Sequence, residues 1–223
     1  MIKLNLQLHG GRGAGGSLSN APSGENINIQ SQTDVWTYRH REQNEPFVDN
    51  INDAVRQVND DFPGLMSETV NEVNSAELGG ADRYNTLGFY GGGQLALNAN
   101  YTNVEKMNSV YDKGVADGYH PGRGNKTGTQ AVAYHELGHA ITDHIGRKHG
   151  LGDIDKTANK IVKDAYKNSK AKGGNYNWAG KISRYAQKNY AECVAEAVAD
   201  WYCNGNKASD TSKAIMAELK KYK

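Results

Sequence analysis

Apolar residues recur every three or four positions along most of the chain. Residues 46–60 show this spacing, and it returns over residues 65–73. Such a period is typical of helices that bury one face. The pattern therefore predicts two helices in the first half of the chain. It predicts four more in the second half, at 127–146, at about 153–172, at 189–204 and from about residue 209.

One segment changes to the period of two that is typical of strands. Residues 84–90 and 94–101 alternate apolar and polar side chains, and Gly91, Gly92 and Gly93 lie between them. Glycines between two alternating runs favour a tight turn, so we predict a β-hairpin over 84–101. The fold class is then α+β, mainly helical with a small sheet. An exposed hairpin edge could bind an extended peptide as an added strand, but a hairpin that only supports the core explains the pattern as well.

The first 33 residues differ in composition from the rest. A short alternating piece at 2–8 is followed by a glycine-rich run at 10–16 and by Ser, Asn and Pro. This composition buries too little apolar surface to order a chain, so we predict a flexible leader over 1–33 and one domain over 34–223. The Lys-Leu-Asn-Leu-Gln and Gly-Gly-Arg-Gly pieces resemble the opening of many phage and prophage head proteins.

Net charge and hydropathy exclude few classes of protein. The chain has 26 Lys and Arg against 25 Asp and Glu, a net charge of +1, which gives no general attraction to nucleic acid. Residues 156–188 hold nine bases and one acid, Asp164, which could face phosphate but are more ordinarily a solvated helix face. No apolar run approaches the roughly 20 residues of a membrane span, and no signal peptide is recognisable. We expect a soluble protein without a membrane partner, in a host cytoplasm or a virion.

The most informative motif is His-Glu-Leu-Gly-His at residues 135–139. On a helix, H-E-x-x-H places two imidazoles one turn apart with a carboxylate between them. Catalytic zinc takes three protein ligands and keeps one position for water, so His135 and His139 require a third ligand elsewhere. The metzincin extension would place a histidine six residues after His139, where the chain has Ile145. The third ligand must therefore come from another segment.

Three acids, Glu192, Glu196 and Asp200, recur every four residues on the predicted helix 189–204. That face is otherwise apolar, and buried acids are costly unless positive charge meets them. Zinc and its histidines would meet them, because one carboxylate can bind the metal while others accept the free ring N–H of a ligating histidine. An exposed acidic stripe on a surface helix is the alternative.

Residues 185–197 resemble the second active-site helix of the gluzincins of the anthrax lethal factor and Pro-Pro endopeptidase group. The shared pattern is a tyrosine followed, seven residues later, by a glutamate within A-E-x-x-A-E-A, and the resemblance extends over about 84–204. It implies a zincin-like metallopeptidase domain, with Glu192 as the third zinc ligand, Glu196 supporting the ligands and Tyr185 stabilising the oxyanion. Cys193 and Val194 depart from lethal factor, which has aromatic residues there.

These residues suit peptide-bond hydrolysis with one Zn²⁺ per chain. Zinc lowers the pKa of its bound water to about 7, and Glu136 can take the proton and later give it to the leaving amine. A hydroxyl at Tyr185 would donate to the oxyanion, although the chain has 13 tyrosines and Tyr185 could simply pack. We predict a zinc metalloendopeptidase acting on a protein or peptide, with Glu196 and Asp200 holding the ligands.

Two other functions remain open from the sequence. The leader suits a virion structural or head-morphogenesis protein that carries a zincin-like module as an assembly element, with phage virion proteins as partners. Glu136 argues against this alternative, because a structural zinc needs no base. A nucleic-acid-binding accessory using residues 156–188 is the third possibility. His120, which precedes Pro121, could line the cleft.

Overall fold

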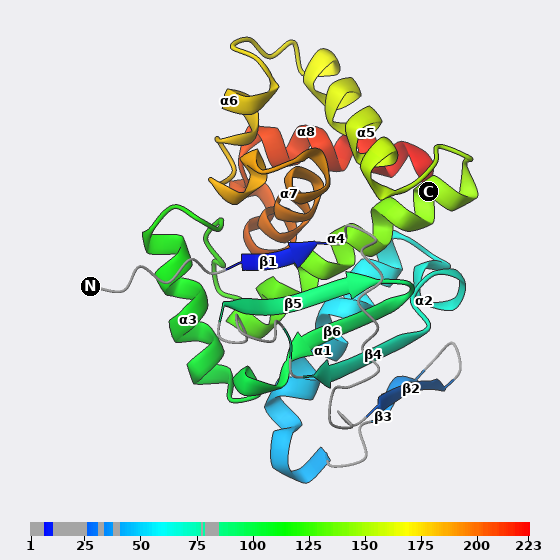
Figure 1. The fold of residues 1–223 in the computed structure, drawn as a ribbon, viewed down its shortest axis with the longest axis vertical. Helices are drawn as coiled ribbons and strands as arrows, with labels where there is room; N and C mark the ends of the chain where they lie inside the picture. Colours follow the sequence, from blue (N-terminus) through cyan, green and yellow to red (C-terminus); the bar gives the residue numbers. More distant parts are fainter. Residues whose placement is uncertain (1–6, 11–25, 31–33, 38–40, 77, 79–84) are drawn as a thin grey trace.

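The fold is mainly helical, with helices packed on one mixed sheet (Figure 1). The computed structural model describes residues 7–10, 26–30, 34–37, 41–76, 78 and 85–223. The helices are α1 (Arg41–Asp61), α2 (Leu65–Glu68), α3 (Val104–Ala116), α4 (Gly128–Lys148), α5 (Ile154–Asn168), α6 (Asn175–Ala179), α7 (Tyr190–Asn204) and α8 (Asp210–Leu219). The expected α+β class is confirmed at this level.

The sheet has six strands in the order β1-β5-β6-β4-β2-β3. They are β1 (Gln7–Gly10), β2 (Asn26–Gln30), β3 (Asp34–Thr37), β4 (Glu72–Ala76), β5 (Thr86–Gly91) and β6 (Gln94–Asn98). β1 and β2 come from the segment expected to be a flexible leader, yet they form strands of this sheet. The rest of that segment lies outside the described residues.

The predicted hairpin is confirmed over β5 and β6, which pair antiparallel. Gly92 and Gly93 adopt positive φ angles of 59° and 84° in the turn, which explains the glycines there. The last predicted strand residues, Ala99–Tyr101, form a 3-10 helix instead, and Tyr84 lies outside the described residues. β1 pairs in parallel with β5, so the hairpin edge proposed for a peptide is paired with a strand of the same chain.

The prediction of a second helix through Val73 was wrong. α2 ends at Glu68, and Val73 belongs to β4, which pairs in parallel with β6. The pairing begins at once, because Asn71 N–H donates to the carbonyl of Gly93 at 2.9 Å. Four apolar residues at helical spacing suit a turn of helix followed by a half-buried strand equally well, and pairing with β6 decides between them.

The predicted helices of the second half are confirmed. α4 begins at Thr127, whose hydroxyl accepts from Gln130 N–H while the Gln130 side chain accepts from Thr127 N–H, both at 3.1 Å. The side chains of Asn189 and Ser209 cap α7 and α8 by accepting from the N–H groups of Glu192 and Ser212. α3, which the apolar pattern did not reveal, buries only Met107, Tyr111 and Gly114.

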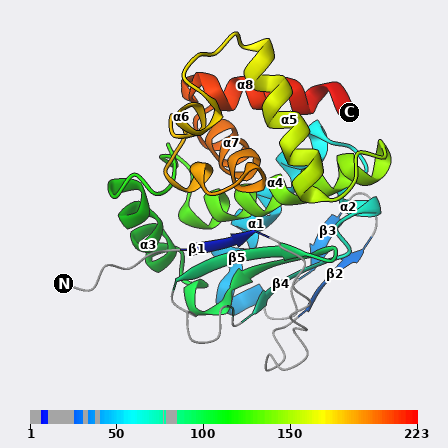
Figure 2. The same cartoon turned by 45° about the horizontal axis from the view of Figure 1, so that its top comes forward.

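α4 lies at the centre of the molecule, with the sheet on one side and α5, α7 and α8 on the other (Figure 2). α4 and α7 approach closely at Gly138, where an added Cβ would lie 2.7 Å from the Cα of Ala195. Glycine therefore lets the two helices that carry the motif residues meet backbone to backbone. Within the described residues, no helix has the length and apolar character needed to cross a bilayer.

Candidate metal centre

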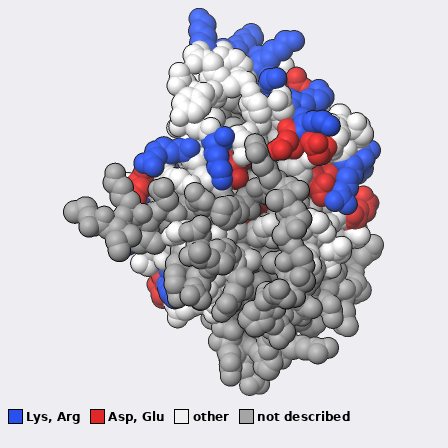
Figure 3. Space-filling view, viewed as in Figure 1, with Lys and Arg blue, Asp and Glu red and all other residues white. Residues whose placement is uncertain are grey.

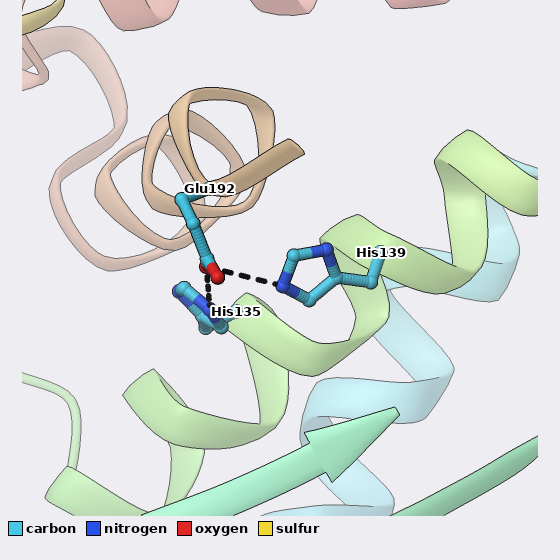
Figure 4. A group of neighbouring side chains, drawn as sticks. All are labelled: His135, His139 and Glu192. Atoms are coloured by element: carbon cyan, nitrogen blue, oxygen red, sulfur yellow. Dashed lines mark ion pairs between the residues drawn. The ribbon is translucent and has the colours of Figure 1, made fainter. Parts of the chain in front are cut away.

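Three side chains from α4 and α7 converge where the two helices meet. His135 and His139 lie one turn apart on α4, and Glu192 lies in the first turn of α7. Glu192 Oε2 is 3.2 Å from His135 Nε2 and 3.3 Å from His139 Nε2. Figure 4 shows the carboxylate reaching from α7 toward both rings. The three ligand atoms all lie within 4.8 Å of one another.

These facing atoms suit a metal ion. His135 Nε2, His139 Nε2 and Glu192 Oε2 are buried and find no hydrogen-bond partner in the described part of the chain. A buried polar atom left without a partner costs about 1–3 kcal/mol, so three of them facing one another call for a ligand. Ligand atoms about 2.0–2.1 Å from a tetrahedral zinc lie about 3.3 Å apart, which agrees with the two distances of 3.2 and 3.3 Å. The group could therefore hold a metal ion, and its donors are compatible with zinc.

Glu196, one turn after Glu192, holds the outer side of His135. Its Oε1 accepts hydrogen bonds from His135 Nδ1 at 2.8 Å and from His120 Nδ1 at 3.3 Å, and its Oε2 accepts from Ser183 Oγ at 2.7 Å. Burial would raise the pKa of this carboxyl, but the contacts with His120 and His135 hold it at about 2. The charged carboxylate keeps the proton of His135 on Nδ1, which leaves Nε2 free to bind a metal.

The two histidines of the motif have opposite pKa shifts. Burial acts to lower the pKa of both His135 and His139. Each ring nitrogen of His135 contacts a carboxylate, Glu192 at Nε2 and Glu196 at Nδ1, and these contacts raise its pKa to about 10. Among the described residues His139 contacts only the Glu192 carboxylate, so burial prevails and its pKa is lowered. A charged His135 would carry its second proton on Nε2, so metal binding at that atom would release the proton.

Glu136 is fully buried beside β5, and neither of its oxygens finds a partner among the described residues. A Cβ at Gly88 would lie 2.7 Å from Glu136 Oε1, so glycine at this position leaves room for the carboxylate. Burial above all, together with the charges of Glu192 and Glu196, raises its pKa to about 8, against the opposing charge of His135. Glu136 is thus a carboxyl group without a structural partner that can exchange a proton near neutral pH.

Tyr185 lies beside the group, as the motif implied. Its hydroxyl donates to Glu192 Oε1 at 3.2 Å, and its ring centroid is 5.9 Å from that of His135. Tyr119 and His120 pack against the same ring, with centroids 4.9 and 5.8 Å away. Burial raises the pKa of Tyr185, so its hydroxyl keeps its proton and acts as a donor.

The structure does not bring Asp200 to this group. Its carboxylate accepts hydrogen bonds from Asn204 Nδ2 at 2.9 Å, Ser209 N–H at 2.9 Å and Ser212 Oγ at 2.7 Å. Asp200 lies eight residues after Glu192, about 12 Å along the helix axis, which takes it away from the histidines. It connects the end of α7 to the start of α8.

Two residues of the centre were not assigned their roles from the sequence. His120, expected at most to line a cleft, is buried and supports Glu196. Ser183 lies in the loop between α6 and the 3-10 helix η3 (Tyr185–Gln187) and donates to the same carboxylate. The position of His120 before a proline was only a weak sign of a functional role. A single serine in a loop, such as Ser183, gives no such sign in the sequence.

Two lysines of the basic stretch 156–188 pair with acids, one just before the stretch and one within it. Lys156 pairs with Asp153 at 3.5 Å, and Lys160 pairs with Asp164 at 2.6 Å. Figure 3 shows Lys and Arg side chains spread over the upper helices, with Asp and Glu among them. This mixture fits a solvated helix face.

Comparison of the chain with protein-family models, with curated proteins and with solved structures found no significant match.

Proposed function

We propose that the protein is a zinc-dependent endopeptidase of the zincin type, in which His135, His139 and Glu192 hold one zinc ion. The observation that carries this proposal is the set of three buried, unpartnered ligand atoms that face one another. Two imidazoles and one carboxylate are a known ligand set of catalytic zinc. The likeness of residues 185–197 to a gluzincin helix supports the same assignment.

When bound, zinc acts as a Lewis acid that polarises a peptide carbonyl and lowers the pKa of water to about 7. Glu136 is the residue that moves protons. Its unpartnered carboxylate accepts a proton from the attacking water and later transfers it to the leaving amine. Because Glu136 adjoins a ligand but points toward β5, it can do this without binding the metal itself.

Tyr185 is the residue that meets the charge developing on the carbonyl oxygen. Its hydroxyl donates to Glu192 Oε1, and rotation of that O–H toward a substrate oxygen would supply the donor. Removal of such a donor typically costs about 2.7–4 kcal/mol of barrier. Glu196, through His135, keeps the first ligand oriented while the substrate binds.

One observation favours a structural metal site in a virion assembly module instead. His135, His139 and Glu192 are all at most 1% exposed, and structural zinc sites are closed whereas catalytic ones keep an open position. Glu136 argues for the enzyme, because a structural site has no use for an unpartnered buried carboxyl.

Glu136→Gln separates the two functions. We expect the wild type and this variant both to contain about one zinc per chain by elemental analysis, and only the wild type to cleave a peptide library. Glu105→Gln, an exposed acid on α3, is the matched control and should cleave normally. Cleavage by Glu136→Gln at the wild-type rate would refute the mechanism. Zinc in all three proteins with no cleavage by any would favour the structural site.

A further inference from the structure

A tight turn at the start of α7 places a lysine beside the candidate centre. Lys188 follows the 3-10 helix η3, and Asn189 caps α7 by accepting from Glu192 N–H at 2.8 Å. Lys188 reaches both Tyr185 on η3 and Glu192 in the first turn of α7. Lys188 Nζ donates to Tyr185 Oη at 3.2 Å and lies 4.9 Å from the centroid of its ring.

The carboxylate of Glu192 has two sides with different neighbours. Oε2 faces both histidines, at 3.2 and 3.3 Å. Oε1 accepts from the Tyr185 hydroxyl at 3.2 Å and lies 4.0 Å from Lys188 Nζ. Tyr185 and Lys188 therefore hold one oxygen away from the histidines, which leaves the other as the single ligand atom.

We propose that Lys188 is a positioning residue of the metal centre, which keeps Glu192 monodentate and sets the Tyr185 hydroxyl as a donor. The expected effect of Lys188 on catalysis rests on the function proposed above. Its expected effect on metal binding rests only on the geometry around Glu192. Neither the gluzincin pattern nor the spacing of the acids singles out this lysine.

The chemistry of Lys188 suits both tasks. An ammonium group that donates to a phenol oxygen draws electron density from it and strengthens the phenol O–H as a donor. The same cation attracts Glu192 Oε1, so the carboxylate keeps its orientation when the Tyr185 proton turns toward a substrate oxygen. With the Lys188 side chain 43% exposed, the ammonium stays in contact with water and is not a core group.

The test compares Lys188→Met, which keeps the length of the stem, with Lys188→Arg, which restores charge and donors. Lys181→Met, an exposed lysine after α6, is the matched control. We expect Lys188→Met to bind zinc about 10-fold more weakly in a chelator competition, as is typical of residues that support a ligand. We also expect its kcat to fall about 10-fold or more with little change in KM, and Lys188→Arg to recover most of both losses.

Thermal unfolding of the metal-free proteins shows whether the fold is intact. A surface substitution changes stability by about 0.5 kcal/mol or less, so the midpoints of all three variants should agree with the wild type within about 2 °C. If Lys188→Met matches Lys181→Met in zinc affinity, the proposal is overturned. If Lys188→Met weakens zinc binding but the wild type cleaves no peptide, the endopeptidase fails while the role of Lys188 in holding Glu192 stands.

Discussion

The two ends of α7 carry buried acids that the sequence presents alike but the structure uses differently. At the first end, Glu192 Oε2 faces two histidine nitrogens and has no hydrogen-bond partner within the described residues. At the other end, the oxygens of Asp200 accept three hydrogen bonds. Burial is therefore common to both ends. The unpartnered oxygen of Glu192 distinguishes the candidate metal-binding end from the structural end.

The structural end works as a helix junction. Ser209 caps α8 by accepting from Ser212 N–H at 3.0 Å, while Asp200 accepts from the N–H of Ser209 itself. A charged acceptor for a capping residue fixes the angle between two helices without any ligand. The contrast between the ends predicts that substitutions at one should change metal binding and substitutions at the other should change stability.

Glu192→Ala should have the largest effect. Loss of a ligand should weaken zinc binding by more than about 100-fold, beyond the range of residues that only support one. At 100 times the wild-type Kd, zinc should stabilise the wild type by about 2.7 kcal/mol and the variant by less than about 0.4 kcal/mol. Elemental analysis and thermal unfolding with and without zinc measure this. Equal zinc binding by the two proteins would remove Glu192 from the centre.

Asp200→Ala should show the opposite behaviour. It leaves Ser209 N–H without its acceptor and removes the charged partner of Ser212 Oγ, so we expect a loss of about 2–4 kcal/mol in the free energy of unfolding. For a chain of this length the midpoint should fall by about 4–16 °C. Zinc stoichiometry should stay at the wild-type value. A loss of zinc at unchanged stability would place Asp200 at the centre after all.

Glu196→Gln should give an intermediate effect confined to metal binding. The amide keeps the size of the side chain but cannot hold His135, His120 and Ser183 as a charged acceptor does. We expect zinc affinity to fall about 10- to 100-fold in a chelator competition. Glu218→Gln, a buried acid on α8, is the control and should bind zinc normally. Similar zinc affinities in the two variants would contradict the role of Glu196.

Two matched serine substitutions should give the smallest effects. Ser183→Ala removes a donor to Glu196, and Ser212→Ala removes a donor to Asp200, both from bonds of 2.7 Å. Each bond is worth about 1 kcal/mol. We expect Ser183→Ala to weaken zinc binding a few-fold, and Ser212→Ala to lower the unfolding midpoint with zinc binding unchanged. If Ser212→Ala weakened zinc binding and Ser183→Ala changed only the unfolding midpoint, the proposed distinction between the two ends of α7 would be wrong.

Periodicity predicted the helices that carry the centre because their signals are local. α4 and α7 have their caps and apolar faces within one segment each. The motif on α4 named His135, Glu136 and His139, and the resemblance of residues 185–197 to a gluzincin helix implied Glu192. β1 and β4 were not recognised, because their stability comes from pairing with distant strands.

The supporting residues were predictable only where they share a helix with a ligand. Glu196 was named because it follows Glu192 by one turn, and the same rule wrongly favoured Asp200 as a neighbour of the histidines. His120 and Ser183 come from loops whose course depends on the packing of α3, α6 and α7. Such contacts depend on tertiary structure, so the spacing of residues along the chain does not predict them.

The pairing of β1 with β5 also has a consequence for any peptide that would bind along that edge. Because β1 belongs to the same chain as β5, its pairing is intramolecular, and dilution of the protein does not weaken it. A free peptide would have to displace β1 before it could pair with β5 along that edge. Occupancy of the edge by another chain is therefore governed by how readily β1 exchanges, and affinity measured on the intact chain would understate the intrinsic affinity of β5.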